Sequence, residues 1–247
     1  MTFDIEYAFK CFSPILAKLP VTLRMTLIAV IIALAGGIIL ALGVKCKNAI
    51  VRIIVNIINS FLKGVPILVF LYIFNYSMDD IMTGLSKIFA FEYDIRNPPK
   101  VFFAILALAL SYAPYMCDMI VTAYDTLPKG QMEACDAFGF TKFQAMKRII
   151  LPQMLVVALP NFGNHFVNLL KATSLAYMVT ILEMLGAAKN FAVLNQRFLE
   201  TYVVAALIYW VVFGMFEQIF QFLERNSGKY LRLHIVQKRR LFKEKAV

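Results

Sequence analysis

The sequence predicts an all-α membrane protein with five transmembrane helices. Hydrophobic residues make up 61% of the 247 residues and charged residues 16%, whereas soluble domains average about half apolar and about a quarter charged residues. The run Met25–Val44 holds twenty uncharged residues, enough at about 1.5 Å per residue to cross a hydrocarbon core of about 30 Å. The predicted spans, within one transmembrane domain covering 1–247, are 21–43, 54–77, 101–123, 154–171 and 201–223.

Each span has its own justification. The first is expected to stay in the membrane rather than be cleaved as a signal peptide, because its leader carries Asp4 and Glu6 and its run is long. The second is interrupted by Lys63, and we expect the helix to break there because Gly64 and Pro66 follow. The other three rest on uncharged runs of sixteen or seventeen residues, which are Val101–Cys117, Met154–Leu170 and Thr201–Phe216.

The distribution of lysine and arginine predicts an external N-terminus and a cytoplasmic C-terminus. In this orientation fifteen basic residues fall on the inner side, within the first inner loop, the loop 128–153 and the basic tail 225–247, and eight fall on the outer side. Cytoplasmic segments carry the basic excess in membrane proteins. The main outer connection is then 77–100, where we expect a short amphipathic helix over residues 79–89.

Charge and motifs argue against several functions. The net charge of +10 is concentrated in a tail next to a span, so we expect it to anchor the topology or meet anionic lipids, not nucleic acid. The chain lacks a P-loop, a His-Glu-x-x-His motif and a Gly-x-Ser-x-Gly motif. Its cysteines show no metal spacing, and His165 has no second ligand within a turn. We therefore predict neither catalytic nor metal-binding residues.

The loop 128–153 reads as two short helices joined by a glycine. Pro128 suits the first position of a helix, and Gly139 suits a left-handed stop. Thr141 and Gln144 have capping-box spacing, which predicts the start of a second helix. Pro152 is expected to end that helix and begin the fourth span.

This loop resembles the EAA loop of ABC-importer permeases. Glu133-Ala134-Cys135 is followed after three residues by Gly139, and after nine more by Ile149-Ile150-Leu151-Pro152. The departure in the core of the motif is Cys135, where the family usually has alanine, a small-for-small change. The resemblance covers about residues 20–225 in one collinear order.

Shorter motifs resemble the polar amino-acid subfamily, the histidine, glutamine and arginine type. Gly130-Gln131 and Gln153 flank the loop as they do there. Lys63-Gly64-Val65-Pro66 is similar to its Arg-Gly-Thr-Pro, and Lys171-Ala172-Thr173-Ser174-Leu175 to its Lys-Asp-Thr-Ser-Leu. The resemblance implies the type I importer permease fold in a bacterial cell membrane.

The resemblance implies that the loop is a coupling helix seated in a cleft of a separate ATPase. Acidic and apolar side chains on a short helix suit a protein groove, although the same periodicity fits an amphipathic loop lying on the bilayer. The expected coupling residues are Gln131, Glu133, Ala134, Asp136 and Gly139. ATP and Mg²⁺ would be bound by two cytoplasmic ATPase subunits, so this chain would need no cofactor of its own.

Polar residues inside the spans form the second candidate site. Lys63 lies about mid-membrane and either lines a substrate path or is a structural lysine paired with a carbonyl or an acid. Asp118 matches a glutamate of the subfamily, but Val121 replaces the arginine three residues later. Asp118 therefore faces Lys63, lines the path, or sits in the inner headgroup zone.

A polar stripe follows on the fourth span. The stripe consists of Asn161, Asn164, His165 and Asn168, which fall at i, i+3, i+4 and i+7 on one helix face just after Pro160. This face therefore meets either a pathway or another helix through hydrogen bonds. Lys171 either belongs to the path or snorkels to the outer surface. The predicted pathway residues are Lys63, Gly64, Pro66, Asp118, Asn161, Asn164, His165, Asn168, Lys171, Thr173 and Ser174.

Five helices are too few to surround an amino-acid-sized path, so we expect a second permease copy or a homologous permease, with the path at a two-fold interface. The resemblance adds an external solute-binding protein and an amino-acid substrate, polar or cystine-like, carried inward by ATP-driven alternating access. An ion-coupled secondary transporter and a non-transporting membrane scaffold are the competing readings. The first would require carboxylates within the spans, where Asp118 is the one candidate.

Overall fold

The computed structural model describes residues 3–128 and 130–244, with side chains placed up to residue 227. The described chain is helical between short connections, which confirms the predicted all-α class. In chain order the helices are α1 (Ile5–Leu16), α2 (Leu19–Val44), α3 (Ala49–Gly64), α4 (Ile67–Phe89), α5 (Lys100–Asp125), α6 (Gly130–Ala137), α7 (Lys142–Ala145), α8 (Leu151–Ala172), α9 (Met184–Asn195) and α10 (Phe198–Glu244).

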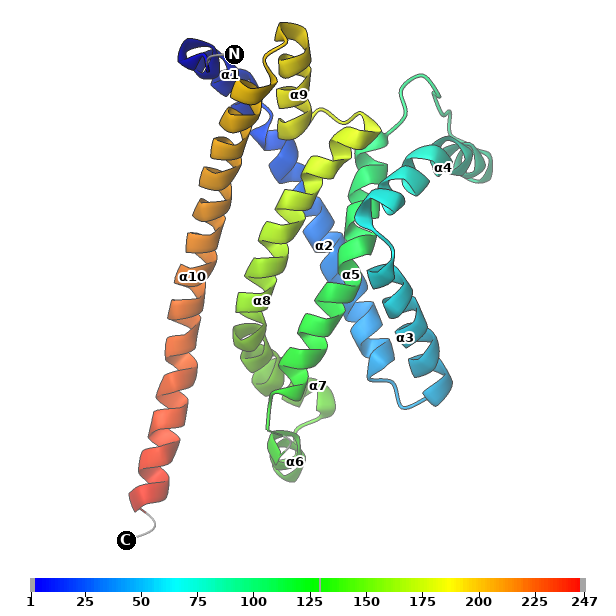
Figure 1. Ribbon diagram of the computed structural model, residues 1–247. Helices are drawn as coiled ribbons and strands as arrows, with labels where there is room; N and C mark the ends of the chain where they lie inside the picture. The colour runs from blue at the N-terminus through cyan, green and yellow to red at the C-terminus, as the bar shows by residue number, and fades with distance from the viewer. Residues whose placement is uncertain (1–2, 129, 245–247) are drawn as a thin grey trace.

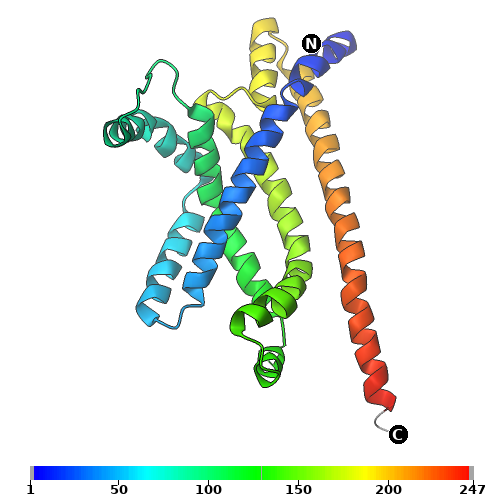
Figure 2. The same cartoon turned by 180° about the vertical axis from the view of Figure 1, so that it is seen from behind.

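The long helices α2, α5, α8 and α10 run along one axis and separate two ends of the molecule (Figure 1). The N-terminus, α1 and α9 lie at one end, whereas α6, α7 and the last turns of α10 lie at the other. The view from behind shows the same separation (Figure 2). Helices α6 and α7 and the last turns of α10 therefore share an end, which is the relation that the distribution of lysine and arginine predicts.

Membrane-spanning length and composition are found in several of the described helices. Three qualify alone, namely α2, α5 and the part Phe198–Ser227 of α10. Two bent pairs qualify together: α3 with α4, and the helical run Lys142–Val179 with α9. Three to five candidate spans follow, and the five predicted spans correspond to the upper bound.

The second predicted span is not one helix over 54–77. The chain breaks after Gly64, and α3 and α4 meet at 97°, because Val65 takes an extended conformation before Pro66, as residues preceding proline prefer. The predicted break at this point is confirmed. The first turns of α4 still pack against α5, where Phe70 and Leu71 are buried, and the amphipathic helix expected over 79–89 is the second half of α4.

The connection between α4 and α5 is hydrogen-bonded back to α4. The hydroxyl of Tyr93 donates a 2.6 Å hydrogen bond to the Asp79 carboxylate. Since this bond and the negative charge both favour the protonated phenol, they raise the pKa of Tyr93 to about 12.

The centre of the fold is the contact between α2 and α5. Of the three helices that qualify alone as spans, α5 is the most enclosed. In its most apolar stretch 67% of the residues are buried, against 28% in each of α2 and α10. Buried small residues recur every fourth position along α2, at Ala29, Ala33, Gly37 and Ala41. A Cβ on Gly37 would lie 2.5 Å from the Met116 Cβ. Small residues at such spacing allow close approach of helix backbones in membranes.

Two helices at the N-terminal end were not expected from the sequence. The first, α1, begins at Asp4, whose carboxylate accepts from the Tyr7 N–H. The second, α9, begins at Glu183, which is fully buried and accepts 2.8 Å hydrogen bonds from the Gly186 N–H and the Tyr209 hydroxyl. Both helices are shorter than a span and lack a continuous apolar run, so composition alone did not identify them.

Candidate functional site

The loop 128–153 forms the two predicted helices, α6 and α7. Gly139 follows α6 with φ of +75°, the left-handed conformation that only glycine adopts without strain. The Phe140 N–H bonds to the Cys135 carbonyl, and the Gly139 N–H to the Asp136 carbonyl, the double closure of a Schellman motif. The next helix starts with both bonds of the capping box between Thr141 and Gln144. The predicted stop and start signals are thereby confirmed.

Both prolines of the loop act differently from expectation. Pro128 precedes α6, and its carbonyl accepts from the Gln131 N–H. Pro152 does not end the second helix: α7 continues through a π-helical turn, Met146–Ile150, directly into α8. Pro152 lies in the first turn of α8, where its missing N–H is tolerated. The second loop helix and the fourth span are therefore one continuous helical rod.

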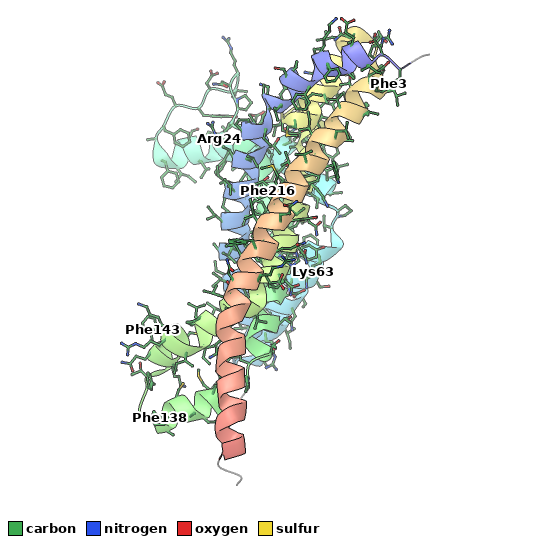
Figure 3. All side chains as sticks on the ribbon, turned by 90° about the vertical axis from the view of Figure 1, so that its left-hand side faces the viewer. Phe3, Arg24, Lys63, Phe138, Phe143 and Phe216 are labelled. Carbon is green, nitrogen blue, oxygen red and sulfur yellow. The ribbon has the colours of Figure 1, made fainter. Side chains whose placement is uncertain are left out.

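One face of the loop packs inward and the opposite face projects. Cys135 and Ala145 are buried with 3% and 0% of their surface exposed, whereas Phe138 and Phe143 are 82% and 74% exposed. Both phenylalanines lie on the segment that projects sideways from the long helices (Figure 3). Cys135 thus belongs to the internal contact, where a small side chain is required. The predicted coupling residues Glu133, Ala134, Asp136 and Gly139 are exposed.

Gln131 has another role. It is half-buried, and its amide exchanges two hydrogen bonds of 2.9 Å with the amide of Gln153 on α8. Gln153 also donates to the Ile149 carbonyl at 2.8 Å, which fixes its orientation. The first loop helix is thereby attached to the base of the rod. Gln153 was recognised in the sequence as a flanking residue but was not included among the predicted coupling residues.

Lys63 and Asp118 meet within the membrane part of the chain. The Lys63 Nζ lies 2.6 Å from the Asp118 Oδ2, and the side chains are 31% and 54% exposed. Lys63 lies in the last turn of α3, and Figure 3 shows it between the levels of Arg24 and Phe143 along the molecule. Of the arrangements left open for Asp118, the structure has it facing Lys63. The pair supplies the acid–base partner that Val121 cannot.

The polar stripe of α8 faces away from the rest of the chain. Asn161, Asn164 and Asn168 are exposed, and His165 is half-buried, with its ring 5.9 Å from that of Tyr115 on α5. Tyr115 is 38% exposed and lies three residues before Asp118 on the same helix face. The Lys63–Asp118 pair joins α3 to α5, and the Tyr115–His165 contact joins α5 to the stripe of α8. These residues of α3, α5 and α8 are called the polar face below. Tyr115 was missed in the sequence, although its i, i+3 spacing from Asp118 was a usable signal.

Not every predicted pathway residue lies on this face. Gly64 and Pro66 are exposed at the break after Lys63. Thr173 is fully buried and donates its hydroxyl to the Leu170 carbonyl, while Ser174 donates to the Lys171 carbonyl. The Lys171 ammonium lies 5.1 Å from the centre of the Phe213 ring on α10. The structure thus directs Lys171 and Thr173 into helix contacts and not toward Asp118.

Relatives of known family match nearly the whole chain. The model of the family described as binding-protein-dependent transport system inner membrane component matches residues 21–228. The probable amino-acid permease protein YxeN of Bacillus subtilis is 36% identical over 231 residues, covering 94% of this chain and 99% of that protein. The L-cystine transport system permease protein TcyL of Bacillus subtilis is 32% identical, covering 92% of each.

Solved structures agree with the sequence matches. A crystal structure described as an amino acid ABC transporter with histidines superposes with a TM-score of 0.76 at 25% identity, covering 92% of this chain and 100% of that chain. The architecture is therefore that of a type I ABC importer permease. With its membrane helices and the matched family model, this chain belongs to the binding-protein-dependent transport system inner membrane components and is the membrane subunit of an ABC importer.

Proposed function

We propose that this chain moves an amino acid, polar or cystine-like, into the cell along the face formed by α3, α5 and α8. Exposed polar side chains in a membrane segment are costly in lipid, so the face needs either water or another chain against it. A second copy or a homologous permease, related by a two-fold axis, places two such faces opposite each other. Relatives named as amino-acid and cystine permeases support this substrate class.

The coupling part of the proposal rests on the projecting loop. The fold implies an ATPase and a binding protein as partners. We place α6 in a cleft on each of two cytoplasmic ATPase subunits, which bind ATP and Mg²⁺. The exposed aromatic rings of Phe138 and Phe143 would become the buried anchors of that contact. The single observation that carries this assignment is the projecting, internally capped α6–α7 unit, continuous with α8.

The proposal also includes an orientation. The N-terminus lies outside with α1 and α9, where the solute-binding protein would deliver substrate, and the C-terminus lies in the cytoplasm. Closing of the ATPase pair draws the two α6 helices together, and the rod from α7 to α8 carries this movement to the polar face. Labelling of Cys46, which is half-buried between α2 and α3, by a membrane-impermeant thiol reagent tests the orientation. It should react in inverted vesicles and not in intact cells.

The experiment that tests the function is uptake into proteoliposomes containing this chain, its ATPase, its partner permease and external binding protein. Labelled glutamine and cystine are offered with ATP inside the vesicles, and accumulation is expected with ATP and not with a non-hydrolysable analogue. Uptake without ATP that collapses with an uncoupler would indicate a secondary transporter instead. Absence of flux for every amino acid in an assembled complex would indicate a scaffold.

A further inference from the structure

We propose that the Lys63–Asp118 ion pair makes the path selective for amino acids with an uncharged side chain, against those that carry a net charge. The inference rests on the proposed function, because it requires that the polar face touches substrate. It adds the charge class of that substrate, which neither the family match nor the fold specifies.

The charges on the polar face of α3, α5 and α8 balance. Within the described residues of this face, Lys63 and Asp118 supply one positive and one negative charge in direct contact. The other polar side chains on this face are the exposed amides of α8, the Tyr115 phenol and the half-buried His165 imidazole, whose ring lies 5.9 Å from that of Tyr115. Nearby charges are engaged elsewhere: Lys171 lies over the Phe213 ring, and Asp125 pairs with Lys45 at the cytoplasmic end. The face therefore presents a charge-balanced surface.

The second step is complementarity with a zwitterion. The ion pair consists of an ammonium and a carboxylate, and the backbone of a free amino acid carries the same two groups. The substrate carboxylate can bind Lys63 while its ammonium binds Asp118, so that opening the pair leaves neither charge without a partner. Removing one partner of a pair away from water is costly because the other charge stays uncompensated. A zwitterion avoids that cost.

The third step concerns a side-chain charge. With Lys63 and Asp118 occupied by the substrate's own carboxylate and ammonium, a guanidinium or a second carboxylate would find the amides and the His165 ring on this face but no further ion pair partner. An unpaired charge at low dielectric is unfavourable, and discrimination between ligands often works through such unpaired groups. The asparagine amides at 161, 164 and 168 can instead donate to or accept from a neutral polar side chain.

The competing explanation is that the pair only holds α3 against α5. The two explanations differ in their response to charge removal. If the pair is only structural, Lys63→Gln and Asp118→Asn lower the stability of the protein similarly and leave the order of the substrate affinities unchanged. If it selects substrate, the two variants shift the order in opposite directions, because one leaves a free carboxylate and the other a free ammonium.

The test is binding of labelled glutamine, arginine and glutamate to the complex of this permease with its partner permease and ATPase in lipid nanodiscs, without the binding protein. Wild type is expected to bind glutamine at least about tenfold more tightly than the other two. Lys63→Gln should raise the arginine-to-glutamine ratio about tenfold, and Asp118→Asn the glutamate-to-glutamine ratio by a similar factor. The double variant should bind all three weakly and prefer neither charged ligand.

The matched control is the second ion pair, Lys45 with Asp125, which joins the ends of α2 and α5 away from the polar face. Lys45→Gln and Asp125→Asn should leave both ratios within about twofold of wild type.

The proposal is overturned if the substrate order is the same in Lys63→Gln, Asp118→Asn and wild type, or if wild type prefers arginine or glutamate. Should a single variant fail to assemble, the neutral double variant still decides, since retained tight glutamine binding there contradicts the proposal. If wild type binds none of the three while ATP-dependent uptake persists, the charge class is wrong and the proposed function stands.

Discussion

The side-chain amides of Gln131 and Gln153 exchange two hydrogen bonds, each 2.9 Å long, and so join α6 to the base of α8. The bond pair is the direct polar link between the projecting helix and the rod that reaches the polar face. A movement imposed on α6 is therefore passed to α8 through this contact as well as through the chain.

Loss of the Gln131–Gln153 hydrogen bonds should uncouple movement of α6 from movement of α8. Gln131→Ala removes two neutral hydrogen bonds worth about 0.5–1.5 kcal/mol each, and we expect ATP-dependent uptake to fall on the order of tenfold with membrane insertion unchanged. Because both residues serve one contact, Gln131→Ala combined with Gln153→Ala should be no worse than Gln153→Ala alone. Fully additive losses would show that the two amides act separately.

The exposed acid of α6 should be essential for transport. Glu133→Ala is expected to abolish ATP-dependent uptake while the protein still inserts into the membrane, because the Glu133 side chain is exposed and is not part of the buried core. Uptake and membrane content measured together separate these effects. Glu92→Ala removes an acid that is likewise exposed, from the connection between α4 and α5, and should transport normally. Normal uptake by the Glu133 variant would count heavily against the coupling assignment.

Gly139 should not tolerate a side chain, for a backbone reason. Its φ of +75° is the left-handed conformation, which costs residues with a Cβ roughly 1–2 kcal/mol. Gly139→Leu should therefore misdirect α7 and abolish uptake, although no atom obstructs a Cβ there. Gly84 of α4 has equally open space and a helical backbone, so Gly84→Leu is the control expected to retain uptake. Equal activity of both leucine variants would refute a conformational role for Gly139.

Gly37 should be intolerant because of packing. A Cβ there would lie 2.5 Å from the Met116 Cβ and 2.9 Å from the Cys117 backbone nitrogen. Overpacking of this kind costs typically about 1–3 kcal/mol, so Gly37→Ala should lower the thermal midpoint of the detergent-purified protein, and Gly37→Leu should prevent its accumulation. Gly214→Ala, where a Cβ meets open space, should leave the midpoint near wild type. A wild-type midpoint for Gly37→Ala would mean that α2 and α5 are not in such close contact.

The buried carboxylate at the start of α9 should stabilise the end of the bundle that holds α1 and α9. Glu183→Ala leaves the Tyr209 hydroxyl and the Gly186 N–H without their acceptor, and an unsatisfied buried group costs about 1–3 kcal/mol. We expect a clearly lower thermal midpoint for Glu183→Ala and a smaller decrease for Glu183→Gln, which can still accept one bond. Tyr209→Phe removes one donor and should fall between wild type and Glu183→Ala. Identical midpoints for all four proteins would contradict the role of Glu183.

The loop 128–153 was predictable because its signals are local. A left-handed glycine at 139 and a capping box from Thr141 to Gln144 depend on residues within one turn, and both formed as expected. The continuation through Pro152 was not predictable in this way. A π-helical turn directly precedes the proline, and the helix continues through it. Whether a helix bends or ends at such a point depends on how α8 packs against its neighbours.

The polar face shows the same division. The i, i+3, i+4, i+7 spacing placed the asparagines and His165 on one side of α8 from sequence alone, and the break at Gly64 and Pro66 was likewise readable. The sequence could not show that Thr173 turns into the core or that Lys171 lies over Phe213. Those outcomes depend on which helices are neighbours, and neither the apolar runs nor the residue spacings of the sequence indicate that.

Hydropathy, capping and glycine conformations act over a few residues, and from them the sequence alone indicated a helical membrane protein, the helix stop at Gly139, the helix start at Thr141 and the break after Lys63. The tertiary structure alone decided that Lys63 meets Asp118 across 55 positions of chain, that α4 turns by 97° from α3, and that the polar stripe stays exposed. Contacts between distant segments are set by the packing of whole helices, such as the small-residue seam of α2 against α5.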